Sequence, residues 1–264
     1  MPTILTVTRA ETLTPTLRRL WFHTDDLSAF ADSTDTDRYV KLVFPRDGQE
    51  LPDDVDLREL RRTKPPEEQP IVRTYTALFP DLAAGSLAID FVIHGDDGVA
   101  GPWARAAEPG DRLLANGPGG GYAPDPTVDW HLLAGDESAV PAITAALAVL
   151  PEEAVARVVI LVDSPDHEPE LATAAQVDVS FVHRSTGDDL ERAVRRLAWL
   201  PGRVQAFVHG EAGVVMHAVR PYLVDERGVA RGDLSISGYW RQGRSEEGFR
   251  DWKAEQARGA SVDR

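Results

Sequence analysis

The stretch Ile71-Val72-Arg73-Thr74-Tyr75-Thr76 is the most informative part of this chain. Its β-branched and aromatic residues predict a strand. Side chains alternate along a strand, so Arg73 and Tyr75 share one face, and Thr76 needs a local twist or its backbone amide to reach the same ligand. An arginine fork suits a diphosphate, while a tyrosine ring and a hydroxyl suit a flat ring with a polar edge, so the pattern favours a flavin dinucleotide. The alternative is an ordinary strand with an exposed arginine and a half-buried tyrosine.

Short β-type segments fill the first half of the chain. Along one of them Leu87, Ile89, Phe91 and Ile93 alternate with other residues, which is typical of a half-buried strand. The six predicted strands are Thr3–Ala10, Thr16–His23, Arg38–Phe44, Ile71–Leu78, Leu87–His94 and Arg112–Asn116. Six such strands predict a small closed antiparallel barrel. Between them, the charged and proline-rich segment from Pro45 to Pro70 predicts a long surface excursion.

Strands and helices alternate in the second half, which predicts a Rossmann-like parallel sheet. The predicted strands are Trp130–Ala134, Val158–Val162, Val177–Val182, Val204–Val208 and Leu234–Ser237. The predicted helices are Ala139–Leu150, Leu190–Leu200, Ala212–Leu223 and Glu246–Ala257. A ligand should lie beyond the carboxyl ends of the strands, where Gly135 to Ser138, Asp163 and His209 to Glu211 fall. We expect two domains, 1–124 and 125–264, with a hinge between Gly117 and Pro126.

Composition excludes several classes of function. The chain has 264 residues and a formal net charge of −15, which disfavours nucleic acid as a partner. It has no cysteine, so redox chemistry would have to come from a bound organic cofactor and not from a thiol or a Cys-ligated cluster. No apolar run reaches the ~20 residues that span a membrane, and no secretory pattern opens the chain. We therefore expect a cytoplasmic protein without membrane insertion.

Further motifs follow the first in a fixed order, and together they resemble a known family. They are Asp90-Phe91-Val92-Ile93-His94-Gly95, Ala100-Gly101-Pro102-Trp103, Gly117-Pro118-Gly119-Gly120-Gly121-Tyr122, Gly135-Asp136-Glu137-Ser138, His209-Gly210-Glu211 and Gly238-Tyr239-Trp240-Arg241. This series resembles the siderophore-interacting proteins, flavin-dependent ferric-siderophore reductases of the ferredoxin-reductase-like superfamily, from about Arg9 to Phe249. The resemblance implies an antiparallel FAD-binding barrel followed by a Rossmann-like NAD(P)H-binding domain. It also implies electron transfer from NADH or NADPH, with ferredoxin as an alternative donor, to Fe(III) in a siderophore, and release of Fe(II) for intracellular use.

The same resemblance implies a set of site residues. The expected cofactor-binding residues are Arg73, Thr74, Tyr75, Thr76, Asp90, Val92, His94, Ala100, Gly101, Trp103, Gly119, Asp136, Glu137, Ser138 and Trp240. The expected substrate-binding residues are Lys41, Arg241 and Arg244. The family commonly has a hydroxyl residue where Gly101 stands, and Pro102 has no N–H, so we expect one or two phosphate contacts to be missing. Electron transfer to iron requires no acid or base, so no catalytic residue and no metal ligand is assigned.

Three features of the sequence allow other interpretations. Ser138 lacks the G-x-S-x-G context of a hydrolase nucleophile and suits a helix N-cap instead. His167-Glu168-Pro169-Glu170-Leu171 lacks the second histidine of a zinc motif. Asp163 suits a ribose diol and hence NADH, but His167 and Arg184 nearby favour a 2′-phosphate, so the preference between the two nucleotides stays open. Another flavin oxidoreductase with a non-iron acceptor, or a siderophore-binding protein without turnover, are the rival functions.

Overall fold

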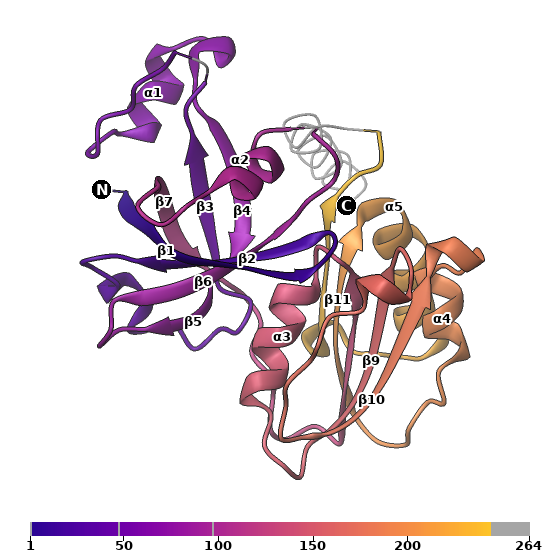
Figure 1. Ribbon diagram of the computed structural model, residues 1–264. Coiled ribbons are helices and arrows are strands. Elements are labelled where there is room, and N and C mark those ends of the chain that lie inside the picture. Colours follow the sequence, from indigo (N-terminus) through magenta and orange to yellow (C-terminus); the bar gives the residue numbers. More distant parts are fainter. Residues whose placement is uncertain (1, 47, 97, 244–264) are drawn as a thin grey trace. The chain divides into compact units, whose positions relative to one another are not determined.

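The computed structural model describes residues 2–46, 48–96 and 98–243. The chain forms two compact units (Figure 1). The first comprises Met1–Pro124, Pro141–Leu150 and Asp166–Ala174, and the second comprises Asp125–Val140, Pro151–Pro165 and Ala175–Arg264. The division into continuous domains 1–124 and 125–264 stays a prediction.

The first unit is built on an antiparallel sheet. Its strands within the described residues are β1 (Thr3–Thr14), β2 (Leu17–His23), β3 (Tyr39–Phe44), β4 (Ile71–Thr76), β5 (Leu78–Asp81), β6 (Ser86–Val92) and β7 (Arg112–Gly119). They are arranged in the order β4-β3-β7-β1-β2-β6-β5. The two outermost strands, β4 and β5, are consecutive in the chain with only Ala77 between them, so the sheet curves until its edges meet. The predicted barrel is confirmed, but the strand expected over Ile71–Leu78 divides into two at this point.

Alternation along the strands places one set of side chains inside this barrel. The interior contains large apolar residues that are at most 1% exposed, among them Leu5, Phe22, Leu42, Ile89 and Phe91. Along each strand, the residues before and after these side chains point to the opposite face of the sheet. The apolar interior is therefore continuous across β1, β2, β3 and β6, and it holds β4 and β6 in fixed register with their partners.

The excursion from Pro45 to Pro70 contains structure that the sequence analysis missed. Helix α1 (Leu57–Thr63) begins after Asp56, whose carboxylate accepts hydrogen bonds from the backbone N–H groups of Arg58 and Glu59. Val55 is buried against Val43 of β3 and Leu114 of β7. The segment thus packs on the sheet through a small apolar cluster of its own.

A parallel sheet forms the second unit. Its strands within the described residues are β8 (Trp130–Asp136), β9 (Val155–Val162), β10 (Gln176–His183), β11 (Val204–Glu211) and β12 (Leu234–Trp240), in the order β10-β9-β8-β11-β12. Every residue of the central strand β8 is buried, as expected for a strand covered on both faces. The order reverses between β8 and β11, and in such sheets a ligand binds beyond the carboxyl ends at the point of reversal. The predicted fold class is confirmed.

Helices are shorter than expected in this half. Helix α4 (Leu190–Arg196) ends before the predicted Leu200. The helix expected over Ala212–Leu223 consists of α5 (Ala212–Val214) and two wider π-helical stretches, Val215–Val219 and Tyr222–Glu226, on either side of Pro221. Helix α3 (Val140–Val149) follows β8 but belongs from Pro141 onward to the first unit, where its Ala145 packs on Leu78 and Ala88. The helix expected over Glu246–Ala257 lies outside the described residues.

Helix α2 (Ala100–Ala106) completes the first unit. No helix in the described part of the chain is both long and apolar enough to span a membrane.

Candidate functional site

Strand β4 presents Arg73 and Tyr75 on one face, as alternation predicted. Opposite them on β3 lie Leu42 and Val40, both of which point into the barrel core. Tyr75 is half-buried, and its ring lies 4.6 Å from that of Phe91 on β6, centroid to centroid. Arg73 is also half-buried, and its Nη1 donates to the carbonyl of Val72 at 3.1 Å. A charged fork and an aromatic ring therefore stand together where β4 approaches β6.

Helix α2 adds a second aromatic side chain, which lies next to residues of β6 and β3. The ring of Trp103 lies 6.0 Å from Phe91 and 5.9 Å from Phe44, centroid to centroid. Before the helix, His94 is exposed on a turn that Arg105 fastens by bonding to Gly95 and Asp96. This arrangement brings the start of α2 next to the end of β6.

Two residues at these element ends are smaller than usual. Ala100 is buried at the start of α2. A Cβ added to Gly101 would lie 3.7 Å from the carbonyl oxygen of Val92, an ordinary contact. The start of α2 thus lies within van der Waals distance of the end of β6.

Asp90, expected at the cofactor, is occupied by a neighbouring strand. Arg19 of β2 lies opposite it and donates Nε to Oδ1 at 2.6 Å and Nη2 to Oδ2 at 2.7 Å. The Asp90 side chain is fully buried and Arg19 is 15% exposed. Burial raises the pKa of Asp90 and outweighs the two hydrogen bonds from Arg19, which lower it. Both carboxylate oxygens of Asp90 accept hydrogen bonds from Arg19. A role of Asp90 in binding a cofactor therefore stays a prediction.

Lys41 and Thr74 lie on the face of the sheet opposite to Arg73 and Tyr75. They are cross-strand partners on β3 and β4, and Asn116 of β7 is the next residue along the same row. Both Lys41 and Thr74 are exposed, whereas Thr76, further along β4 on their face, is buried. The predicted residues of the first unit are thus divided between two faces of one sheet.

The glycine-rich segment expected as a hinge is attached to the barrel. Gly119 belongs to β7 and lies under the ring of Tyr39, since an added Cβ would be 2.4 Å from that ring. Asp37 accepts hydrogen bonds from the backbone N–H groups of Gly121 and Tyr122, both at 2.9 Å. Burial raises the pKa of Asp37, against these two bonds, which lower it. The segment up to Tyr122 is therefore bonded to the first unit, and a hinge between Gly117 and Pro126 stays a prediction.

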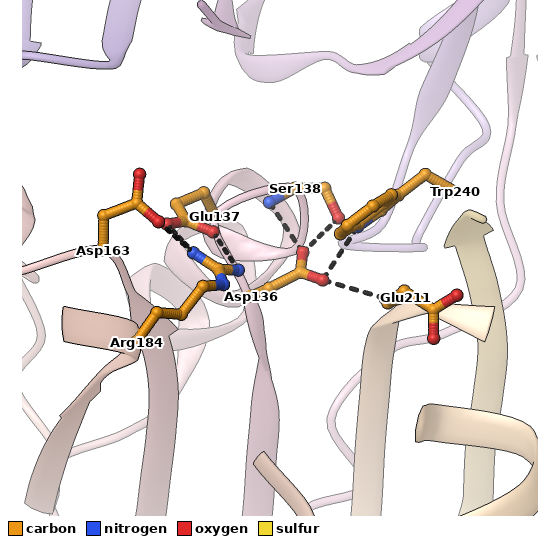
Figure 2. Close-up of polar contacts among 7 residues, drawn as sticks. All are labelled: Asp136, Glu137, Ser138, Asp163, Arg184, Glu211 and Trp240. Atoms are coloured by element: carbon orange, nitrogen blue, oxygen red, sulfur yellow. Dashed lines mark hydrogen bonds and ion pairs between the residues drawn. The ribbon is translucent and has the colours of Figure 1, made fainter. Parts of the chain in front are cut away.

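In the second unit, Asp136 is the centre of a polar network at the carboxyl end of β8 (Figure 2). Its Oδ1 accepts from the hydroxyl of Ser138 at 2.5 Å and from the backbone N–H of the same residue at 3.0 Å. Its Oδ2 accepts from the backbone N–H of Glu211 and from the indole N–H of Trp240, both at 2.8 Å. Burial raises the pKa of Asp136, and the hydrogen bonds from Ser138 and Trp240 lower it less. One carboxylate thereby ties together the ends of β8, β11 and β12.

A second network lies beside the first and involves the ends of β8, β9 and β10 (Figure 2). Arg184 donates Nη1 to Glu137 at 2.5 Å and to Asp163 at 2.8 Å, and Nη2 to Glu137 at 2.7 Å. Burial lowers the pKa of Arg184, but the bonds to Glu137 and Asp163 outweigh it and raise the pKa. Arg184 is therefore a permanent cation held by two carboxylates.

Comparison with known proteins assigns the chain to a family. The model described as "Siderophore-interacting FAD-binding domain" matches residues 6–122, and the one described as "Siderophore-interacting protein" matches residues 128–243. The ferric vibriobactin reductase ViuB of Vibrio cholerae is 32% identical over 95% of this chain and 93% of its own. The chain belongs to the siderophore-interacting protein family.

Two further comparisons agree with this family. The crystal structure of a siderophore utilization protein from T. fusca has a TM-score of 0.78 and 32% identity, covering 93% of this chain and 94% of the other. The NADPH-dependent ferric-chelate reductase of Escherichia coli is 36% identical over 57% of this chain and 58% of its own. The resemblance inferred from the ordered motifs is thus confirmed.

Within this family framework, the structure collects the predicted residues into sets. Tyr75 and Trp103 lie next to Phe91 in the first unit, with Arg73 on the same face of β4 as Tyr75, and Asp136, Ser138 and Trp240 gather in the second. Arg241 lies next to Trp240 and contacts Glu211 at 3.4 Å, whereas Arg244 lies outside the described residues.

Four residues around these sets were not expected to act as partners. They are Arg19, Asp37, Glu211 and Arg184. The sequence placed Glu211 and Arg184 near the carboxyl edge of the parallel sheet, but it did not pair them with Asp136 or Glu137. Their long separation in sequence from the residues they bind left no local signal.

Proposed function

We propose that the protein is a flavin-dependent ferric-siderophore reductase, which moves electrons from NAD(P)H through FAD to Fe(III) in a siderophore and releases Fe(II). The observation that supports it best is that Tyr75 of β4 and Trp103 of α2 both lie next to Phe91, with Arg73 on the same face of β4 as Tyr75. The first half of this chain also matches a siderophore-interacting FAD-binding domain. Ferric reductase activity belongs by name to two relatives, and we extend it to this chain.

The residues present suit FAD chemically. A half-buried guanidinium on a paired strand is a fixed donor for a diphosphate. Tyr75 and Trp103 offer aromatic surface for the flat ring system, beside Phe91. We assign Arg73 to the diphosphate, Tyr75 to the ring, and the backbone of Val92, His94 and Gly101 to the remaining polar groups. Thr74, Thr76, Asp90, Ala100 and Gly119 stay proposed cofactor residues.

The task of the protein side chains is placement. Bound FAD supplies the conversion between two-electron transfer from a nicotinamide and one-electron transfer to iron. Arg73 and Tyr75 hold and orient the cofactor, and the apolar barrel beneath them excludes water from one side. No side chain has to move a proton in the step that reduces iron, so we assign no catalytic acid or base.

An anionic ferric siderophore must bind although the protein as a whole is negatively charged. The formal net charge of −15 repels an anionic ferric siderophore, so a local positive charge is needed. We propose Lys41, exposed on β3, and Arg241, at the end of β12, for this role, together with Arg244.

We place the pyridine nucleotide at the carboxyl edge of the parallel sheet, where the strand order reverses. Asp136, Glu137, Ser138 and Trp240 would line that position. NADH and NADPH are both candidates, with ferredoxin as the alternative donor. We propose the cytoplasm as the location of the reaction, since reduced pyridine nucleotides are produced there.

Arg73→Ala tests the cofactor assignment. Loss of a charge-assisted contact of about 1.5–3 kcal/mol should weaken FAD binding roughly 10- to 150-fold, measured as flavin retained after gel filtration and by titration of the stripped protein. Arg112→Ala is the matched control, because Arg112 lies on β7 of the same barrel in an exposed pair with Asp53. Full flavin occupancy in Arg73→Ala would contradict the assignment.

Turnover distinguishes the rival functions. The purified protein should be yellow and should reduce a ferric siderophore with NADH or NADPH, which a ferrous-specific dye would report. Yellow protein that is inert towards ferric chelates would indicate another acceptor, and colourless protein that binds the siderophore would indicate a binding protein without turnover.

A further inference from the structure

The carboxyl edge of the parallel sheet contains both residue types that separate NADH from NADPH. Asp163 directly follows β9, the strand next to the central β8. In dinucleotide-binding sheets an acidic residue near this point binds the ribose 2′-hydroxyl, whereas a nearby arginine accommodates a 2′-phosphate. Arg184 directly follows β10. The sequence alone cannot rank the two, because each residue predicts a different nucleotide.

The hydrogen bonds of Arg184 rank them. Its fork is bidentate to Glu137, with Nη1 to Oε1 at 2.5 Å and Nη2 to Oε2 at 2.7 Å, and Nη1 also reaches Asp163 at 2.8 Å (Figure 2). The guanidinium that a 2′-phosphate would need is therefore already hydrogen-bonded to two carboxylates.

Glu137 cannot easily release this arginine. Its side chain is 8% exposed, compared with 34% for Arg184 and 47% for Asp163. Taking the guanidinium away would leave a buried carboxylate without a counter-charge, which proteins strongly disfavour. Glu137 thus acts as a positioning residue that holds Arg184 against the end of β9.

The remaining charge at this point is negative. One guanidinium faces two carboxylates, so a phosphate placed on Arg184 would add its negative charge beside Asp163. A ribose hydroxyl meets the opposite situation. Asp163 Oδ2 has no protein partner in the part of the chain that the structure describes, and its side chain is half-exposed, so this oxygen can accept a hydrogen bond.

We propose that the Glu137–Arg184–Asp163 network makes the protein selective for a nicotinamide dinucleotide without a 2′-phosphate, that is, NADH over NADPH. Asp163 accepts the hydrogen bond of the adenosine 2′-hydroxyl, and Glu137 keeps Arg184 from serving a phosphate. This inference rests on the proposed function, in which the same edge of the sheet binds the electron donor.

Binding of two donor fragments to the FAD-loaded protein tests the inference without turnover. Calorimetric titration should show that ADP-ribose binds at least tenfold more tightly than 2′-phospho-ADP-ribose. Asp163→Ser should reduce this ratio at least tenfold, because it replaces the charged carboxylate acceptor of the ribose hydroxyl and removes one of the two charges that oppose a phosphate. Adding Arg184→Ala to Asp163→Ser should abolish any binding gained by the phosphorylated fragment.

Asp178→Asn is the matched control. It removes the same charge from β10 of the same sheet, where Asp178 pairs with Arg157 of β9 away from the carboxyl edge. Its ratio should equal that of the parent protein.

Three results would overturn the inference. They are tighter binding of the phosphorylated fragment to the parent protein, an unchanged ratio in Asp163→Ser, and an equal change in Asp178→Asn. If neither fragment binds and neither NADH nor NADPH reduces the flavin, the inference also fails. Reduction of a ferric siderophore by the dithionite-reduced protein would then show that the reductase assignment stands with another donor.

Discussion

The ion pair between Arg19 and Asp90 allows a quantitative test of how the barrel is stabilised. Arg19→Met removes the guanidinium but keeps most of the apolar stem, and it leaves a fully buried carboxylate without a partner. Such a change costs about 3–5 kcal/mol. At roughly 2–4 °C per kcal/mol for a protein of this size, the midpoint of thermal unfolding should fall by about 6–20 °C.

The double variant Arg19→Met/Asp90→Leu should recover most of this loss, because an apolar pair of similar volume replaces a buried ion pair at little cost. The assay is urea unfolding monitored by tryptophan fluorescence for the parent, the two single variants and the double variant. The four proteins are compared at equal dependence of the unfolding free energy on urea concentration. Arg9→Met is the matched control, since Arg9 pairs with Glu11 while 58% exposed and should contribute less than about 1 kcal/mol. The double variant should also retain FAD, because both oxygens of Asp90 serve Arg19.

The same pair predicts a dependence on pH. Burial raises the pKa of Asp90 in the folded state, and Arg19 limits that rise. Arg19→Met should raise the pKa further. When a carboxyl group has a higher pKa in the folded than in the unfolded protein, the free energy of unfolding falls as the pH rises from the unfolded pKa to the folded pKa. The deficit of Arg19→Met should therefore grow above about pH 4. An equal deficit at pH 5 and pH 8, or a double variant as unstable as the single one, would refute the reasoning.

Two further predictions concern the carboxyl edge of the parallel sheet. Gly135→Ala should destabilise the protein by about 1–3 kcal/mol, because the added Cβ would lie 2.4 Å from the carbonyl oxygen of His209; Gly121→Ala, with nothing within 4 Å, is the control for thermal unfolding, and equal midpoints would contradict the packing. Trp240→Phe should cost about 1.5–3 kcal/mol in urea, because it removes one of the donors to the Asp136 carboxylate; an unchanged midpoint would mean that this bond contributes nothing.

Most strands could be predicted from the sequence because their signal is local. β9 is rich in valine, isoleucine and leucine, and large apolar residues recur at every second position of β6, so each could be recognised without knowing its neighbours. The expectation that β6 is half-buried was wrong, because Ala88 and Asp90 on its other face are buried as well. The break at Ala77 could not, because it depends on the curvature of the whole barrel. Helix α1 was missed although Asp56 and Glu59 form an N-terminal capping pattern, since the surrounding charges and prolines favour a loop.

The candidate sites show the same division. Arg73 and Tyr75 are two residues apart, and alternation alone places them on one face. Two of the partners of Asp136 lie 75 residues away at Glu211 and 104 residues away at Trp240. Only the order of the strands brings such residues to one edge. No pattern within a single segment of the chain could have paired them.

The single residue between β4 and β5 constrains how the length of this protein can vary. Ala77 is buried, and its N–H donates to the carbonyl of Arg38 at 2.7 Å. A residue inserted here would have no space and would separate the edge strands β4 and β5. The segment from Pro45 to Pro70 lies at the surface and already departs from the sheet. Homologues should therefore differ in length in that segment, while the stretch from Thr76 to Leu78 stays free of insertions and deletions.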